Sequence, residues 1–377
     1  MSLGRVAIVH GLRRGGAHRR LHETIPFWEL EIKEFILSDA DACTSNPEIV
    51  KVWSLSDQLP QLLRPPIRYV DFFLRRLAYN RLSRKVRSWE PDAVFINPCR
   101  SLKSPPLEAK ILRKSVFWLD ELPRSLEIDE FKNTVRPLTR AIYAPLRYLL
   151  RRNNRKVLAK VPIVLTSSEY MANLISNVYR RPVFPEKCGV SREFFCNSET
   201  IKQNLVISVG SLIPGKGHDL TIESLGKSGL GLSLVIVTHH PVESEMRRLN
   251  HIANRVGIDV TFQFGISDRE LAELFRSAVF TSYLATLEPF GLVSIESQAC
   301  GTPALVSKEG GLPETIIDGV TGLSVVRDIE SVAAAMHEIA QWSIAPEMQQ
   351  KCCDFGKSWQ WSATAESVAR HLEQVAQ

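Results

Sequence analysis

The chain has 377 residues, 44% of them hydrophobic and 23% charged, with a net charge of +6. It is too long for one typical core, so two domains are expected, and the composition is ordinary for a soluble globular protein. No apolar run approaches the roughly 20 residues that would span a bilayer.

The charge is divided unevenly along the chain. Residues 1–190 carry 33 basic and 19 acidic residues, a balance of +14, while the remainder carries 14 and 22, a balance of −8. This asymmetry suggests two domains with different partners.

The sequence favours a cytosolic location. It begins with a strand-like run that lacks the layout of a signal peptide. Seven scattered cysteines, odd in number, argue against a disulfide framework, and no cysteine or histidine cluster has the spacing of a zinc site. We therefore expect a protein of the cytosol or of the cytosolic face of a membrane.

The first half alternates between strand-like and helix-like segments. A loop at residues 11–16 leads to a helix from Ala17, and Ser168-Glu169 is a second helix start. Two long basic helices are expected near residues 66–89 and 138–160. Short buried strands are predicted at residues 5–10, 93–96, 115–119 and 163–166.

The second half repeats this logic after a connection marked by Pro182, Pro185 and Gly189. Strands are predicted at residues 205–209, 232–237, 260–264 and 279–283. A loop at 210–217 precedes a helix from His218, and residues 355–375 form a final helical region. Such alternation indicates parallel sheets, whose ligands gather beyond the carboxyl ends of the strands.

Glu288 and Glu296 stand eight positions apart around a Pro-Phe-Gly turn. A glycine that opens a helix, here Gly291, leaves free backbone N–H groups that form a ready anion site. Glu288 precedes that helix start and Glu296 lies about two turns inside it, so the two carboxylates can meet different parts of one extended ligand. Carboxylates accept several hydrogen bonds, which suits hydroxyl-rich partners such as sugars and riboses.

This segment resembles the Glu-x7-Glu motif of retaining GT-B glycosyltransferases of glycosyltransferase group 1 (family 4). The resemblance implies two Rossmann-like domains with parallel sheets facing across a cleft, and a nucleotide-sugar donor. In the family the first glutamate, here Glu288, faces the donor hexose. The second, here Glu296, holds the nucleotide ribose.

The loop from Gly210 to Gly217 follows a strand and precedes a helix. Glycines let a backbone approach a phosphate, and Lys216 supplies a point charge. The loop resembles the family's Gly-Arg-Leu-x-Pro-x-Lys-Gly segment, whose cations bind the donor diphosphate, but Ser211 replaces the usual arginine. The resemblance places the donor-binding residues at Gly16, Ser211, Lys216, Phe264, Phe290, Gly291, Leu292 and Glu296.

Two segments of the first half extend the resemblance. Gly15-Gly16-Ala17 is similar to the family's Gly-Gly-Ala-Glu start, although His18 replaces the glutamate. The run from Trp118 to Arg124 is similar to the family's His-Glu-Pro-Pro-Arg motif, with Asp120 at the position of the histidine. Asp120 is thus a candidate catalytic residue beside Glu288, or else a helix cap. The candidate acceptor side comprises Gly15, Glu121 and Arg124.

Other interpretations of short segments stay open at this point. Asp39-Ala40-Asp41 has the DxD form with which GT-A glycosyltransferases hold a divalent metal. His239-His240 follows a strand where relatives have a Gly-x-Gly turn, and is either a nucleotide contact or a surface turn.

The resemblance therefore implies a retaining, metal-independent hexosyltransferase without a cofactor. It would move a hexose from a GDP- or UDP-sugar to a glycan or lipid-linked acceptor in surface polysaccharide or lipopolysaccharide synthesis. The predicted domains are 1–188 for the acceptor, 189–354 for the nucleotide-sugar, and 355–377 as a helix crossing back to the first domain. One alternative is a catalytically weak nucleotide-sugar-binding subunit. A nicotinamide-dependent enzyme is disfavoured because the Gly-x-Gly-x-x-Gly fingerprint is absent.

The basic half also predicts contact with an anionic membrane surface. Arginines recur at helical spacing on one side of the second basic helix, opposite apolar residues. Pro145 is expected to break or restart this helix. No motif supports nucleic-acid binding. The arginines are Arg136, Arg140, Arg147, Arg151 and Arg155; the apolar residues are Leu138, Ile142, Leu146, Leu149 and Val157.

Overall fold

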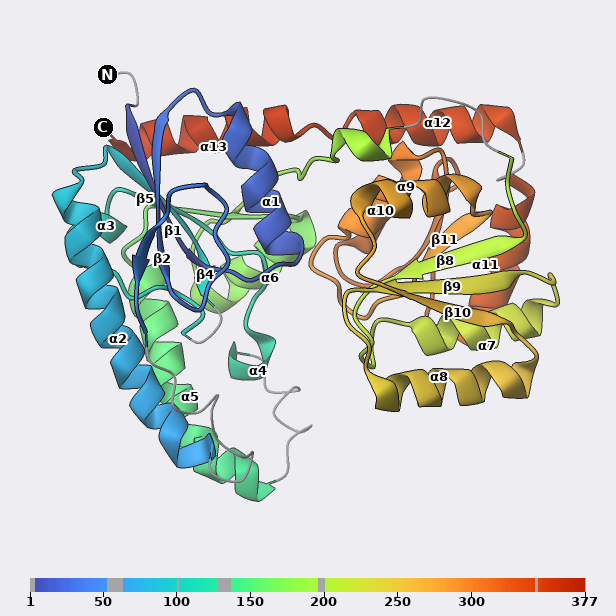
Figure 1. Cartoon of the computed structure of the whole chain (residues 1–377), viewed down its shortest axis with the longest axis horizontal. Helices are drawn as coiled ribbons and strands as arrows, with labels where there is room; N and C mark the ends of the chain where they lie inside the picture. The colour runs from blue at the N-terminus through green and yellow to red at the C-terminus, as the bar shows by residue number, and fades with distance from the viewer. Residues whose placement is uncertain are drawn as a thin grey trace. The chain divides into compact units, whose positions relative to one another are not determined.

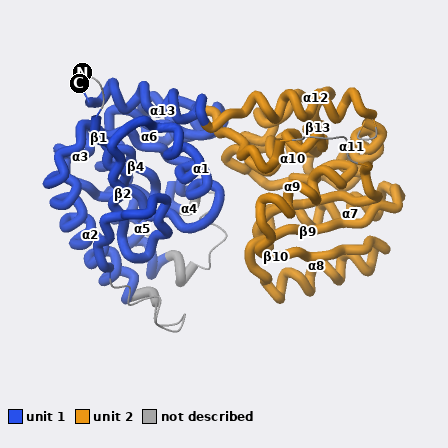
Figure 2. The backbone as a smooth tube through the Cα atoms, turned by 45° about the horizontal axis from the view of Figure 1, so that its top comes forward, with its two compact units in different colours: residues 1–186, 362–377 blue, residues 187–361 orange. Residues whose placement is uncertain are grey.

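The computed structural model describes residues 4–52, 64–99, 102–127, 137–195, 201–342 and 345–376. The chain forms two compact units, one of residues 1–186 with 362–377 and one of residues 187–361 (Figure 2). Among the described residues, no helix is both long and apolar enough to cross a membrane.

Unit 1 is built on a seven-stranded sheet in the order β3-β2-β1-β4-β5-β6-β7, in which all pairs are parallel. The order reverses between β1 and β4, so loops after neighbouring strands diverge there and leave room for a ligand. The strands are β1 (Arg5–Gly11), β2 (Glu31–Leu37), β3 (Glu48–Val50), β4 (Ala93–Cys99), β5 (Ser115–Trp118), β6 (Ile163–Thr166) and β7 (Phe184–Pro185).

Helices cover both faces of this sheet (Figure 1). Alternate strand residues such as Val9 and Phe35 join the core under α2, α5 and α6. On the opposite face Trp28 packs edge-on against Phe95 and donates from its indole N–H to the carbonyl of Ala365 in α13. The helices are α1 (Gly16–Thr24), α2 (Arg64–Ser88), α3 (Ala109–Leu112), α4 (Arg124–Glu127), α5 (Pro137–Leu158), α6 (Glu169–Tyr179) and α13 (Trp361–Ala376).

The expected break at Pro145 is wrong, because α5 continues from Pro137 to Leu158 with the proline inside it. A proline removes one helical hydrogen bond and crowds the preceding turn. Here Tyr69 of α2 compensates. Its hydroxyl donates to the carbonyl of Ile142 at 2.8 Å and accepts from the N–H of Leu146 at 3.3 Å. A tertiary contact therefore bridges the disturbed turn.

Unit 2 is a six-stranded parallel sheet in the order β10-β9-β8-β11-β12-β13, with its reversal between β8 and β11. Buried residues of α7, α8 and α11 pack on one face, and α9, α10 and α12 lie on the other (Figure 1). The strands are β8 (Leu205–Val209), β9 (Ser233–Thr238), β10 (Val260–Phe264), β11 (Phe280–Tyr283), β12 (Ala304–Ser307) and β13 (Gly322–Val325). The helices are α7 (His218–Ser228), α8 (Glu243–Val256), α9 (Asp268–Ser277), α10 (Leu292–Ala299), α11 (Ile329–Trp342) and α12 (Pro346–Lys357).

The units divide at residues 186/187 and 361/362, whereas the sequence pattern placed the divisions at 188/189 and 354/355. The later boundary follows from packing. Trp359 contacts Phe290 at 5.6 Å between ring centroids, and its carbonyl accepts from the N–H of Val190. Gly189 also lies so close to Trp361 that any Cβ would meet its backbone nitrogen at 2.3 Å. These contacts keep residues 355–361 in unit 2.

Candidate functional site

Three loops meet at the carboxyl edge of the unit 2 sheet, beside its strand-order reversal. They follow β8, β11 and β12, which are neighbours in the sheet. The N–H of Thr286 donates to the carbonyl of Gly215 at 2.7 Å, which joins the first two loops. Gly217 has φ +81°, and a Cβ there would meet the carbonyl oxygen of Leu284 at 2.3 Å. Only glycine permits this approach.

The joined loops bring Lys216 and Glu288 together. Their Nζ and Oε2 atoms lie 2.8 Å apart, with each side chain about one-fifth exposed. Tyr283 lies beside the pair, with its ring centroid 5.8 Å from the lysine nitrogen. Burial raises the pKa of the Tyr283 hydroxyl well above its usual range, and the Glu288 carboxylate adds to that effect. The hydroxyl therefore stays protonated and can donate a hydrogen bond to Glu288.

Helix α10 carries the second glutamate. Gly291 caps the helix at φ +124°, and Leu292 begins it, so the first backbone N–H groups face the loop edge. Glu296 lies in the second turn and is 4% exposed. Phe290, predicted to bind donor, is buried against Trp359, so a contact from this position would use its backbone.

The loop after β12 positions Glu288, which the sequence did not reveal. The N–H of Gly311 donates to the carbonyl of Glu288 at 2.8 Å. A Cβ on Gly310, at φ +72°, would meet that same oxygen at 2.4 Å. Leu287 adopts φ +49°, unusual for a branched side chain. The Gly310-Gly311 pair was the available signal, because adjacent glycines often mark a close backbone approach.

Apart from Gly16, which lies in unit 1, the remaining predicted donor residues also lie at this edge of unit 2. Ser211 is exposed in the loop after β8, and Phe264 is exposed at the end of β10. His218 begins α7 and was not predicted to contribute. Its Nδ1 lies 2.9 Å from the Ser208 hydroxyl, and burial lowers the pKa of the imidazole to about 4. The ring is therefore neutral beneath the loop that carries Lys216.

The unit 1 candidates lie at the carboxyl edge of the other sheet. Gly15 and Gly16 follow β1 and open α1, while Asp120 follows β5. Glu121 is exposed beside it, and Arg124 begins α4, with its side chain outside the described part. Asp120 lies in a different unit from Glu288, so the structure groups the candidate residues into two sets.

The two carboxylates of Asp39-Ala40-Asp41 are engaged within unit 1. Asp39 accepts from Arg75 at 2.6 Å, and Asp41 accepts from the backbone N–H of Arg14 at 2.8 Å. They tie the loop after β2 to α2 and to the loop after β1. This use as structural acceptors disfavours the DxD interpretation.

One group of potential metal ligands occurs among the described residues: His10, Glu34 and Cys43, all buried. The backbone N–H of Leu12 donates to His10 Nδ1, so the proton of a neutral ring resides on Nε2, which faces Glu34 at 2.6 Å. A nitrogen that carries a proton cannot bind a metal. We interpret the group as a buried hydrogen-bonded network.

This network predicts a pH-dependent contribution to stability. Burial alone would raise the pKa of Glu34, but hydrogen bonds from His10, Thr44 and the Cys43 N–H outweigh it and lower the pKa to about 2. The unfolded carboxyl binds its proton near pH 4.5, so the stabilisation is present above that pH and lost as pH falls towards 2. Replacing Glu34 with glutamine should lower the free energy of unfolding at pH 7 by roughly 3 kcal/mol.

Urea unfolding at pH 7 and pH 4 measures this effect. The difference in the free energy of unfolding between wild type and Glu34→Gln should be smaller at pH 4 than at pH 7. Glu31→Gln, on the exposed end of the same strand, is the matched control and should change little at either pH. An equal deficit for Glu34→Gln at both values would contradict the assignment.

Comparison with known proteins adds to this geometry. The model of the family described as glycosyl transferases group 1 matches residues 191–359. D-inositol 3-phosphate glycosyltransferases of Mycobacterium tuberculosis and Mycobacterium bovis are 34% identical over 158 residues. That match covers 41% of this chain and 31% of each relative, so it spans about a third of their length.

Similar solved structures cover nearly the whole chain. Sucrose-phosphate synthase of Thermosynechococcus elongatus has a TM-score of 0.71 at 18% identity, over 98% of both chains. WaaG, a glycosyltransferase of lipopolysaccharide biosynthesis, has a TM-score of 0.71 at 17% identity, over 97% of this chain and 99% of its own. Anabaena HepE, solved with UDP and glucose, has a TM-score of 0.69 at 15% identity, over 98% and 100%. Such likeness shows a shared fold.

The expectation of two Rossmann-like units with parallel sheets is thereby confirmed. Residues 191–359 thus resemble the glycosyl transferases group 1 family, and the whole chain has a GT-B fold.

Proposed function

We propose that the chain is a retaining hexosyltransferase that uses a GDP- or UDP-sugar and acts on a glycan or lipid-linked acceptor in surface polysaccharide synthesis. One observation carries the proposal: Lys216 and Glu288 meet at the strand-order reversal of unit 2, next to the start of α10. This edge of unit 2 therefore combines a cation, the free N–H groups at the start of α10 and a carboxylate. These groups match a diphosphate and a sugar hydroxyl.

In this proposal, the residues of unit 2 act mainly through electrostatics. Lys216 and the N-terminus of α10 stabilise the negative charge that grows on the leaving diphosphate. Glu288 accepts a hydrogen bond from a hydroxyl of the hexose, and Glu296 accepts hydrogen bonds from the ribose hydroxyls. The leaving diphosphate takes the acceptor proton in a front-face substitution, so the reaction needs neither a metal nor a cofactor. HepE, which shares this fold, was solved with UDP-glucose, which supports a nucleotide-sugar donor.

Thermal unfolding with a panel of nucleotide-sugars tests the donor class. UDP- or GDP-sugars should raise the unfolding temperature, because a ligand that binds only the folded state stabilises it. NAD should not. A rise with NAD alone would favour the nicotinamide-dependent alternative.

The alternative of a catalytically weak binding subunit rests on Ser211, which leaves Lys216 without the arginine usual in the family, and on Asp120, which replaces the family's histidine. The lysine is moreover paired with Glu288 in the ligand-free chain. Measuring donor hydrolysis and transfer beside donor binding separates the two functions. Binding without either reaction would favour the subunit.

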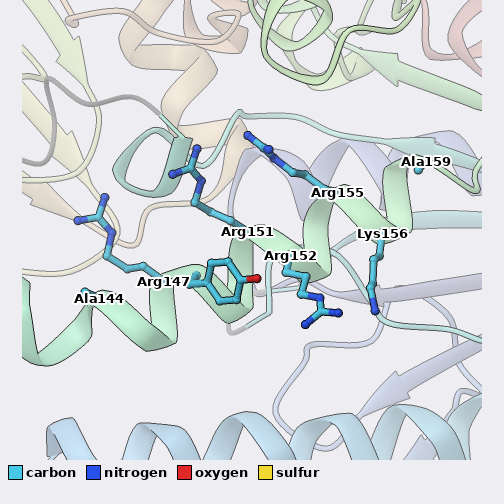
Figure 3. Close-up of a pocket in the computed structure, with 8 residues that line it drawn as sticks. Ala144, Arg147, Arg151, Arg152, Arg155, Lys156 and Ala159 are labelled. Carbon is cyan, nitrogen blue, oxygen red and sulfur yellow. The ribbon is translucent and has the colours of Figure 1, made fainter.

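We further propose that unit 1 docks on an anionic membrane surface, as a peripheral protein of the cytosolic side. A pocket of about 830 Å³ borders α5. Arg147, Arg151 and Arg155 extend from one side of the helix, and Arg152 and Lys156 from the other (Figure 3). Of the arginines predicted from sequence, Arg136 lies outside the described residues, as does the side chain of Arg140.

The two sides of α5 differ in charge balance. Arg151 and Arg155 lie 3.4 and 3.9 Å from the buried carboxylate of Glu127, which partly neutralises them. Arg152 and Lys156 are exposed. Helix α2 adds an apolar stripe of exposed Val70, Phe73 and Leu77 at helical spacing. Basic and apolar side chains together suit a membrane interface.

Co-sedimentation with phosphatidylcholine vesicles, with and without phosphatidylglycerol, tests this docking. Wild type should bind the anionic vesicles and lose binding as salt rises. Replacing Arg152 and Lys156 with glutamine should weaken binding roughly 30-fold, at about 1 kcal/mol for each charge. The control replaces the exposed Lys227 and Arg269 of unit 2 and should bind like wild type. Equal binding to both vesicle types at any salt would rule out electrostatic docking.

A further inference from the structure

The guanidinium of Arg20 is buried, with the residue 1% exposed, and it holds Asp120 in a bidentate pair. Nε donates to Oδ1 at 2.8 Å, and Nη2 donates to Oδ2 at 2.9 Å. Arg20 lies on α1 and Asp120 follows β5, a hundred positions apart. The fold therefore places a fixed cation directly behind a carboxylate that is itself 20% exposed.

Two residues of neighbouring strands orient the guanidinium. Asn97 of β4 accepts a hydrogen bond from Nη2 at 2.7 Å, and the Trp118 ring of β5 lies 4.1 Å from Cζ. Yet Arg20 Nη1 and Asn97 Nδ2 are buried without a hydrogen-bond partner. Buried donors that lack partners are costly. An arrangement selected only for stability would pair these donors. The observed arrangement instead orients the Arg20 guanidinium toward Asp120 and leaves the two donors unpaired, as expected where function constrains a site.

We infer that Arg20 is the positioning residue for Asp120 and makes it a charge-balanced acceptor for a sugar hydroxyl. This inference rests on the proposed function. A carboxylate alone would repel a departing diphosphate, whereas the paired carboxylate has its charge balanced by the guanidinium. The bidentate contact occupies one lone pair on each oxygen, and the remaining lone pairs can accept from a hydroxyl on the exposed side.

The test is a double-mutant cycle on the full chain, with hydrolysis of UDP-glucose and GDP-mannose as the reaction. Arg20→Met and Asp120→Asn should each lower kcat at least tenfold, while the donor Kd from calorimetry stays within about threefold. The double variant should be no slower than Asp120→Asn alone, because Arg20 acts through Asp120. Arg20→Lys keeps the charge without the planar fork, so it should restore part of the loss.

The matched control is Arg75→Met. Arg75 is 5% exposed and paired with Asp39, so its loss should lower the unfolding temperature comparably while the folded protein keeps kcat within about twofold. If the Arg20 and Asp120 substitutions lower kcat independently, so that their effects multiply in the double variant, or if Arg20→Met leaves kcat unchanged, the inference is overturned. The proposed function would not be affected by either result. A wild-type chain that neither binds nor hydrolyses any nucleotide-sugar would instead overturn the proposed function, and the inference with it.

Discussion

Replacing Glu288 with glutamine should lower the rate of sugar transfer by about 10- to 150-fold, the equivalent of a charge-assisted hydrogen bond of about 1.5–3 kcal/mol. The proposed partner of Glu288 is the hexose at the reacting centre, and an interaction that strengthens in the transition state is expressed in turnover. Affinity for the free nucleoside diphosphate should stay the same or rise. Glutamine cannot neutralise Lys216, which lies 2.8 Å from the carboxylate in the ligand-free chain.

Single-turnover transfer assays and calorimetry with UDP and GDP measure the two quantities separately. Glu243→Gln, on the exposed surface of α8, is the control for removing a negative charge from unit 2. It should leave both quantities near wild type. A Glu288→Gln variant that transfers sugar normally, or that loses diphosphate affinity instead, would show that Glu288 does not face the hexose.

Glu296→Gln should weaken donor binding roughly tenfold or more, because one charge-assisted hydrogen bond to a ribose hydroxyl is lost. Glu296 is buried in the second turn of α10, about one turn from the helix end proposed to face the diphosphate. The ribose lies away from the chemistry, so kcat at saturating donor should change less than affinity.

Free UDP or GDP should reveal the Glu296 defect in full, since both contain the ribose and neither contains the hexose. The same titration should show no loss of diphosphate affinity in Glu288→Gln. Calorimetry on folded variants, checked by their thermal transitions, decides the order. If Glu288→Gln loses affinity for the free diphosphate and Glu296→Gln does not, the donor lies along α10 in the opposite direction.

Local sequence patterns were sufficient to predict most of the strands and helix starts. Apolar runs located β1, β5, β6 and the first four strands of unit 2 within one residue, and they located the start of β4, which extends three residues beyond the predicted end. Ser168 was identified as a helix start, and its hydroxyl does accept from the N–H of Met171. These features depend on neighbours in sequence, so periodicity and capping chemistry reveal them.

Strand β2 escaped detection because its sequence carries Glu31, Lys33 and Glu34. A buried glutamate contradicts strand patterning unless its partner is known. That partner, His10, lies on the adjacent strand and 24 positions away. The Pro145 prediction failed for a related reason, since the compensating Tyr69 hydroxyl comes from another helix. Long-range contacts of this kind leave no local signal.

The sequence by itself determined the resemblance to glycosyl transferases group 1, the parallel architecture and the positions of Lys216, Glu288 and Glu296, since these depend on residue types at fixed spacing. Only the tertiary structure decided which of these groups meet. It paired Lys216 with Glu288 through the close approach of two loops, and it set Arg20 behind Asp120 across 100 residues. Strand order creates such encounters, and strand order is fixed by packing of the whole sheet rather than by any local segment.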